Sequence, residues 1–343
     1  MDVVDFQSIQ HLSGLKDRAR MPVIFPIVHL KVFAAATVGL SPHHLRPVAT
    51  AFNLQLFDLL HQIAPRGDGS EVVMGVTDFV RRNLFTATSI AFMGPHFLKK
   101  NTYQDFVEFD EDVVHVIRRL PFRKGKAHAA RERQVEEMVA FLRRYWREED
   151  GGYIEGAADS FMSNVIRNMK TSVLSEEEVA RLQNTFMWGS HANLGQVCIW
   201  LFYHLLANRN MLSRIQEEVQ GALNDQFSNV MTLLHADPRD LEEKTFPLLT
   251  SATQECLRMN SLPSSARLAS EDVDIMGDNG HPIRICKGDI ILANILNMHT
   301  NANYFEDPSV FKFDRFVRNG TDTLRQTKAF LPFGFGSHRV SGP

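Results

Sequence analysis

Apolar residues recur at helical spacing along the chain until its last quarter. The clearest short stretches of this kind are 40–63, 76–94 and 128–150. The first has Ser41 in the N-cap position and Pro42 at the first helical position, which is the usual start of a helix. The third is heavily charged on one face. These patterns predict three amphipathic helices.

A longer helical pattern begins at a capping box. Ser175 is followed three positions later by Glu178, a combination in which side chains and backbone N–H groups satisfy each other at a helix start. The pattern continues to about residue 208. Because its central part is apolar on nearly every side, we expect that part to be buried.

Strand character appears only late in the chain. Residues 265–275 and 282–295 alternate or run apolar, and the turn-rich sequence Gly-Asp-Asn-Gly-His separates them. No internal repeat or low-complexity tract interrupts the chain. The pattern therefore predicts one domain over residues 1–343 that is mainly α with a small β region.

The composition is that of an ordinary globular protein. Its 343 residues are 44% hydrophobic and 22% charged, enough to bury a large core. The net charge of −3 and the isoelectric point near 6.5 give no overall electrostatic case for a nucleic-acid partner or an anionic membrane surface. The most apolar early window, 21–40, contains two prolines, a histidine and a lysine. It does not resemble a membrane span, so we expect no anchor or signal peptide in this chain.

The cysteines give no framework for a disulfide network or a metal site. Cys198, Cys256 and Cys286 are few and widely separated, and none forms a Cys-x-x-Cys pair. A reducing compartment is the expectation, and we predict no metal ligand among the protein side chains.

The first motif with chemical content is Glu255 and Arg258. An acid and a base three apart on a helix share a face and can pair. Such a pair is usually an exposed salt bridge that stabilises little. Here the surrounding helix is largely apolar, and a second arginine follows at Arg315 in Phe-Lys-Phe-Asp-Arg-Phe. A buried carboxylate held by two guanidinium groups would be costly to break.

The chain closes on a Phe-Gly-Phe-Gly loop that starts at Phe333. Gly334 and Gly336 permit backbone angles that other residues avoid, and they let a flat ligand approach the chain closely. Taken alone, the loop is better explained as a glycine turn between aromatic residues. The order of the three motifs along the chain and the distances between them are what favour a functional loop over a simple turn.

Together the three motifs resemble the cytochrome P-450 haem-thiolate monooxygenases. Glu255–Arg258 is similar to the family's E-x-x-R, residues 313–316 to its P-E-R-F, and residues 332–336 to the start of F-G-x-G-x-x-x-C-x-G. In the long helix, Trp188 and Asn193 resemble the branch containing sterol 7α- and 12α-hydroxylases and prostacyclin synthase. The resemblance implies a cytochrome P-450 fold, a haem cofactor, a lipid- or sterol-like substrate and an NADPH-dependent reductase as partner.

Residue by residue, the resemblance implies a support beneath the haem. Glu255, Arg258 and Arg315 would form the family's structural triad, which has a folding role and not a catalytic one. Arg267 and His338 would contact the haem propionates, for which arginine suits a carboxylate geometrically and histidine does so when protonated.

Above the haem, the resemblance implies a catalytic position for Asn193. Its amide would order a water or hydrogen-bond dioxygen, and the alternative is an amide that serves helix packing. Phe333 would open the cofactor-binding loop. His191 and Cys198, on the same helix, are expected to be core or pocket-lining residues.

The family's axial ligand position holds a residue that cannot bind iron. Counting along the loop from Phe333 places the expected cysteine at Val340, which has no lone pair. The family's oxygen chemistry depends on that thiolate, so monooxygenation is not expected of this chain as given. The three cysteines lie outside the loop and do not substitute for it.

Both ends also differ from the family pattern, which predicts an incomplete cytochrome P-450 fold. The family continues past the position of Pro343 with another helix and begins with a membrane anchor. One hypothesis is a change of frame, because GTG TCC GGG CCG, one coding of residues 340–343, gives Cys-Pro-Gly when translated one base later. The alternative is a genuine Val340.

Three functions remain open at this point. The first is a haem-dependent monooxygenase of a lipid or sterol. Its complete form would reside in the endoplasmic reticulum membrane, whereas the chain as given would be cytoplasmic, with membrane contact only through a missing N-terminus. The second is a peroxide isomerase of the prostacyclin synthase type, for which the absence of the family's acid and threonine at Ala192 and Asn193 leaves room. The third is a non-catalytic relic or binding module.

Overall fold

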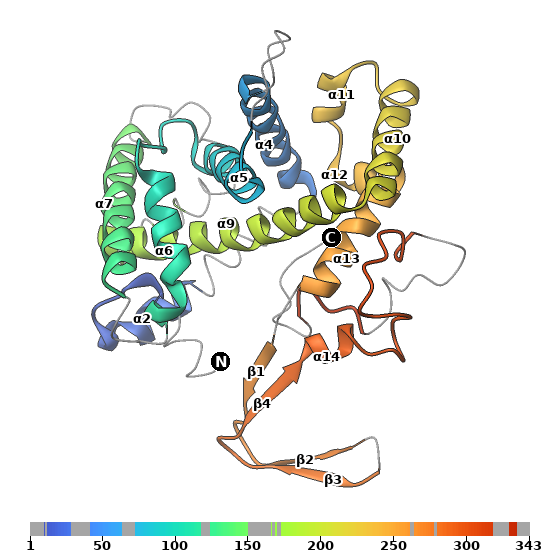
Figure 1. The fold of residues 1–343 in the computed structure, drawn as a ribbon. Coiled ribbons are helices and arrows are strands. Elements are labelled where there is room, and N and C mark those ends of the chain that lie inside the picture. The colour runs from blue at the N-terminus through green and yellow to red at the C-terminus, as the bar shows by residue number, and fades with distance from the viewer. Residues whose placement is uncertain are drawn as a thin grey trace.

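The computed structural model describes most of the chain as helices followed by two small sheets (Figure 1). The described residues are 10, 12–28, 42–63, 73–117, 124–149, 166, 169, 173–260, 264–277, 280–317 and 329–334. Their helices are η1 (Arg18–Arg20), α2 (Met21–Ile27), α4 (Pro42–Ile63), α5 (Val76–Met93), α6 (Thr102–Ile117), α7 (Lys124–Glu149), α9 (Glu176–Ala207), α10 (Arg209–Asp225), α11 (Val230–Leu234), α12 (Pro238–Asp240), η3 (Leu241–Thr245), α13 (Pro247–Asn260) and α14 (Ile295–His299). Their strands are β1 (Ser264–Leu268), β2 (Val273–Met276), β3 (Pro282–Ile285) and β4 (Ile290–Asn294).

The long helix α9 is the element around which the others pack. It contacts α5, α6 and α7 along its first part, and α10 and α13 along its second part (Figure 1). Buried apolar side chains of α2, α4, α5, α7 and α9 join in the largest core cluster, which includes Met93, Leu142 and Val179. The three shorter helices predicted from hydrophobic spacing are present as α4, α5 and α7, and Pro42 begins α4. Ser41, the predicted cap, lies outside the described residues.

The predicted capping box at the start of α9 is confirmed. The Ser175 hydroxyl accepts from the Glu178 N–H at 3.2 Å, and the Glu178 carboxylate accepts from the Ser175 N–H at 2.8 Å. A buried arginine one turn further on, Arg181, donates to Glu132 of α7 at 2.5 Å and to Glu177 at 2.8 Å. These bonds fix the start of α9 against α7.

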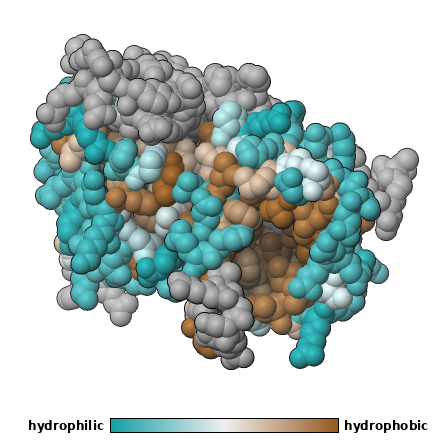
Figure 2. All heavy atoms as spheres, turned by 90° about the horizontal axis from the view of Figure 1, so that it is seen from above, coloured by the Kyte–Doolittle hydropathy of each residue, from teal (hydrophilic) through white to brown (hydrophobic). Residues whose placement is uncertain are grey.

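The prediction that the central part of α9 is buried holds only for its first half. Val179 is fully buried and Met187 is 5% exposed, whereas Trp200 is 41% and Leu206 is 58% exposed. Nothing in the described part of the chain covers this apolar face fully, and Figure 2 shows apolar side chains gathered in a hollow on the upper side of the molecule. Although α9 has 32 residues, no helix within the described ranges is apolar over enough length to cross a membrane.

The late strands form two separate antiparallel pairs. β1 pairs with β4 so that Arg267 lies opposite Ile291, and β2 pairs with β3 so that Val273 lies opposite Ile285. The two long strands expected from the sequence are thus each divided in two. The first run is interrupted between Leu268 and Val273, just after Ala269, whose backbone N–H donates to Asp289 and whose carbonyl accepts from Gly288 at the end of the β1–β4 pairing. The small β region after the helices agrees with the predicted fold class.

Replacing Ser175 by alanine tests the cap of α9. We expect the free energy of unfolding to fall by about 1 kcal/mol, because the Glu178 N–H loses its acceptor at the helix start. Urea titration followed by circular dichroism measures the change. Ser213→Ala is the matched control, since that exposed serine on α10 bonds only the Glu217 side chain among the described contacts. A control loss as large as that of Ser175→Ala would contradict the capping explanation.

Candidate functional site

The site begins with α13, which carries Glu255 and Arg258 on one face. The helix starts at Pro247, and the Glu218 carboxylate of α10 accepts from the Leu248 and Leu249 N–H groups at 2.7 and 3.0 Å. An anion at this end also complements the helix dipole. On the buried side of α13, Ala252 and Cys256 are fully enclosed. This packing directs the acid and the base three positions apart into the protein interior.

Glu255 and Arg258 form a fully buried, two-pronged ion pair. The Arg258 Nε lies 2.7 Å from Oε2 of Glu255, and its Nη2 lies 2.8 Å from Oε1. Both side chains have no exposed surface. The third guanidinium nitrogen, Nη1, donates to the His299 carbonyl at 2.7 Å, and the guanidinium lies over the Phe305 ring. Every nitrogen of this buried cation therefore has an acceptor, which such a charge requires.

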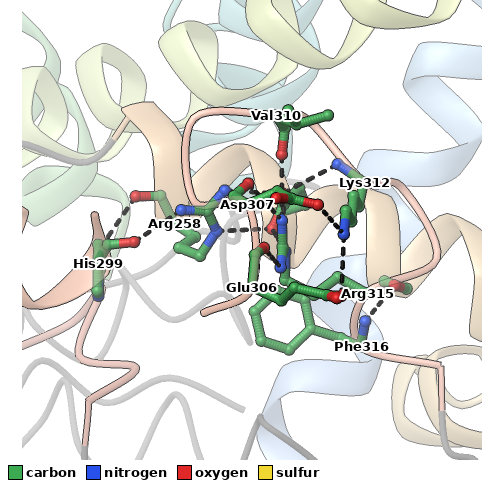
Figure 3. Close-up of polar contacts among 10 residues, drawn as sticks. Arg258, His299, Glu306, Asp307, Val310, Lys312, Arg315 and Phe316 are labelled. Carbon is green, nitrogen blue, oxygen red and sulfur yellow. Dashed lines mark hydrogen bonds and ion pairs between the residues drawn. The ribbon is translucent and has the colours of Figure 1, made fainter. Parts of the chain in front are cut away.

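Arg315 closes the network from the other side. Its Nε lies 3.0 and 2.9 Å from the two Glu255 oxygens, and the backbone N–H of Lys312 donates to Oε1 at 3.0 Å. The remaining Arg315 nitrogens donate to the carbonyls of Glu306, Asp307 and Val310 (Figure 3). The carboxylate is thus surrounded by donors from α13 and from the loop after α14. The buried network predicted from the motif spacing is present, and its position beneath a haem stays a prediction.

Two histidines near this network were not singled out in the sequence, and His299 is bonded directly to it. His299 is fully buried at the end of α14, with Nδ1 3.1 Å from the Arg258 carbonyl and Nε2 3.0 Å from the Leu331 N–H. His204, in the last turn of α9, stacks on Phe311 at 3.8 Å between ring centroids. A lone histidine has no partner motif in sequence, so only the three-dimensional contacts reveal these two roles.

On α9, Asn193 has an exposed side chain whose amide donates to the Gly189 carbonyl of the same helix at 3.1 Å. This exposure disfavours the alternative of a helix-packing amide, and the proposed contact with dioxygen or water stays a prediction. His191 is a core residue, as expected. Its ring nitrogens lie 2.5 Å from the Met187 carbonyl and 3.1 Å from the Ser89 hydroxyl, and burial lowers its pKa to about 4.

Trp188, one turn before Asn193, is bonded to the neighbouring helix α6. Its indole N–H donates to Oδ1 of Asp110 at 2.9 Å, and the other carboxylate oxygen of Asp110 pairs with Arg81 of α5. The aspartate and the arginine are largely buried. The network holds α5, α6 and α9 together beside the stretch 189–193, which the resemblance singled out.

The predicted cofactor-binding residues are only partly within the described chain. Phe333 is half-buried, and Gly334 adopts a φ of +79°, the left-handed conformation that the Phe-Gly-Phe-Gly loop was expected to need. Arg267 lies on β1, but its side chain is outside the described residues. His338 and Val340 also lie outside them. Contacts of these residues with a haem therefore stay predictions.

The pKa of two of the described cysteine thiols is raised by their surroundings. Burial raises the pKa of Cys198 to about 11, and burial together with the Glu255 charge raises that of Cys256 to about 12. Cys286 is exposed in the turn after β3. Within the described residues no group of three or more histidine, cysteine, aspartate or glutamate side chains could hold a metal ion.

Replacing Glu255 by glutamine tests the network directly. We expect the free energy of unfolding to fall by about 3–5 kcal/mol, because two buried guanidinium groups lose their counter-charge. Chemical denaturation of the chain without added cofactor measures this loss. Arg284→Gln, which removes an exposed pair with Asp272 and Asp274, is the control and should change stability by less than about 1 kcal/mol. A loss for Glu255→Gln no larger than the control's would contradict the argument.

Comparisons with known proteins agree with this geometry. A cholesterol 7-alpha-monooxygenase of Cricetulus griseus is 25% identical over 291 residues, covering 78% of this chain and 55% of its own length. A prostacyclin synthase of Bos taurus is 24% identical over 290 residues, covering 78% of this chain and 56% of its own. This chain thus spans about half the length of the curated relatives it matches.

The fold has a solved counterpart. A retinoic acid-bound cyanobacterial CYP120A1 superimposes with a TM-score of 0.69 at 18% identity, covering 91% of this chain and 66% of that one. The family model described as cytochrome P450 matches residues 37–339, which include α4 to α14, Glu255, Arg258, Arg315 and the Phe-Gly-Phe-Gly stretch from Phe333. The chain therefore belongs to the cytochrome P450 family.

Proposed function

We propose that this protein is a haem-dependent cytochrome P450 of the lipid- or sterol-hydroxylating class, and that the chain with Val340 does not itself perform monooxygenation. The main observation in support of a haem-dependent cytochrome P450 is the closed, buried network of Glu255, Arg258 and Arg315. His299 connects that network to the segment leading into the Phe333 loop. The similarity to a cholesterol 7-alpha-monooxygenase supports the sterol class.

The fit of a haem to these residues fails at the axial ligand. The support network is intact, but position 340 offers no donor atom, and no cysteine occurs from residue 329 to the end of the sequence. Burial raises the pKa of the Cys198 and Cys256 thiols, which disfavours their thiolate forms, and both residues lie on helices outside the loop. No reaction step through haem follows for this chain as it stands.

An isomerase is the second candidate, and Asn193 favours it. The resemblance leads us to expect an acid followed by a threonine at 192 and 193, whereas this chain has Ala192 and Asn193. The prostacyclin synthase relative supports a reaction that rearranges a peroxide without an external reductase. The hydroxylase, by contrast, takes electrons from an NADPH-dependent reductase at the endoplasmic reticulum membrane. The non-catalytic binding module is the function that remains if neither activity can be restored.

Replacing Val340 by cysteine tests the proposed defect. The variant completes the family's loop pattern, so we expect it to bind added haem and to show the red-shifted ferrous–carbon monoxide absorption band of thiolate ligation. The unmodified chain and the Val340→Ser control, of similar size but without a thiolate, should lack that band. A thiolate-type band from the unmodified chain, or failure of Val340→Cys to bind haem, would overturn the proposal. Sequencing the transcript through the codons for residues 336–343 separates a genuine valine from a change of frame.

Asn193→Ala in the Val340→Cys background tests the catalytic assignment. We expect turnover to fall about a hundredfold with haem content unchanged, because the amide that orders the oxygen ligand or water is gone. Product formation from a sterol with NADPH and reductase measures hydroxylation, and conversion of a lipid endoperoxide without reductase measures isomerisation. Asn224→Ala, an exposed amide on α10, is the control. Equal turnover of the Asn193→Ala and Asn224→Ala variants would contradict the role of Asn193.

A further inference from the structure

His299 stands between the triad and the segment that enters the Phe-Gly-Phe-Gly loop. We propose that His299 is the positioning residue of this loop, holding residues 329–334 against Arg258 through both nitrogens of its neutral ring. The inference rests on the proposed function in treating the loop as the haem-binding element. The contacts that carry it are independent of residue 340.

The hydrogen bonds of the ring admit one protonation state. The Arg258 carbonyl can only accept, so Nδ1 of His299 carries the hydrogen across the 3.1 Å contact. The Leu331 N–H can only donate, so Nε2 presents its lone pair across the 3.0 Å contact. The neutral Nδ1–H tautomer satisfies both partners, whereas the charged ring, with a hydrogen on each nitrogen, faces the Leu331 N–H with a second donor.

Packing of the aromatic rings adds to the hold on this segment. Phe330 lies 5.7 Å from the His299 ring at an interplanar angle of 30°, and Phe305 lies 6.3 Å away at 88°. Phe330 in turn packs on Phe316 at 4.7 Å, beside the buried Ala329. The loop entrance is therefore held by the hydrogen bond from the Leu331 N–H to the His299 ring and by an apolar cluster.

The link to the triad is reciprocal. The Arg258 guanidinium donates to the His299 carbonyl while the Arg258 carbonyl accepts from the His299 ring (Figure 3). The same guanidinium is fixed by Glu255, which Arg315 also holds. The position of the loop entrance is thus tied through one histidine to a buried ion network on α13.

The charges around the ring favour its neutral form. Arg258 on α13 faces the His299 ring, and its positive charge is paired with the Glu255 carboxylate. The neighbouring Phe305 and Phe330 side chains are uncharged. Burial, together with the Arg258 charge, lowers the pKa of His299 to about 4. Because the unfolded value is near 6.5, the contribution of this group to stability declines as pH falls from about 6.5 to about 4, where the folded ring takes up its proton.

Two amide substitutions separate the bonds that His299 makes. Gln can place its amide oxygen where Nε2 lies and so accept from Leu331, whereas Asn reaches only the Nδ1 position and its bond to Arg258. In the unmodified chain without cofactor, we expect His299→Asn to speed hydrogen exchange of the Leu331 amide about tenfold. His299→Gln should leave the rate within about threefold, which a purely space-filling role would not predict. Exchange of α9 amides, read by NMR in the same samples, reports global unfolding separately.

The pH dependence supplies a second readout. Between pH 6 and pH 4, exchange at Leu331, corrected for its intrinsic rate, should accelerate in the unmodified chain relative to His299→Gln, which has no group to protonate there. Equal exchange in the Asn and Gln variants, or the same pH profile in the unmodified chain and His299→Gln, would overturn the proposal. Failure of Val340→Cys to bind haem would overturn the proposed function instead, since the exchange measurements need no cofactor.

Discussion

The buried carboxylate of Glu255 is the constraint on which the second half of this structure depends. A charge removed from water is tolerated only when donors surround it, and here the donors come from segments far apart in the sequence. Arg258 comes from α13 itself, while Arg315 and the Lys312 N–H come from the loop after α14. The loop consequently takes the path that brings those groups to the carboxylate, and the carbonyls of that path satisfy the rest of Arg315.

Hydrophobic spacing and motif spacing predicted most of this arrangement, but for different reasons. Periodic apolar positions determine helices locally, so α4, α5, α7 and the capping box of α9 followed directly. Motif spacing indicated that Glu255, Arg258 and Arg315 meet. The contacts of His299 could not be predicted, because its ring bonds to the backbone carbonyl of Arg258 and the backbone N–H of Leu331. Backbone groups are the same in nearly every residue, so the sequence does not show which of them a side chain will meet. The division of the late strands was not predicted either, because the apolar pattern does not show where a strand changes its pairing partner.

The two halves of α9 illustrate how context overrides composition. Both halves are apolar, yet the first is enclosed by α5, α6 and α7, while Trp200 and Leu206 in the second are exposed. Between them, the bond from Trp188 to Asp110 ties α9 to α6. The bonds of Trp188 and of His191, which contacts Ser89 of α5, hold the helix on either side of Gly189.

The residues that stabilise the fold of this chain differ from the residue that its proposed chemistry requires. The triad meets the folding demand, because removing any one of its charges leaves another buried without a partner. Under the proposed function, the chemical demand is a sulfur donor at one position of the closing loop. His299 joins the two regions through its ring, without contributing charge to either. Under the proposed function, a valine at position 340 removes the thiolate that oxygen chemistry requires, whereas the buried network is built by residues that precede the loop.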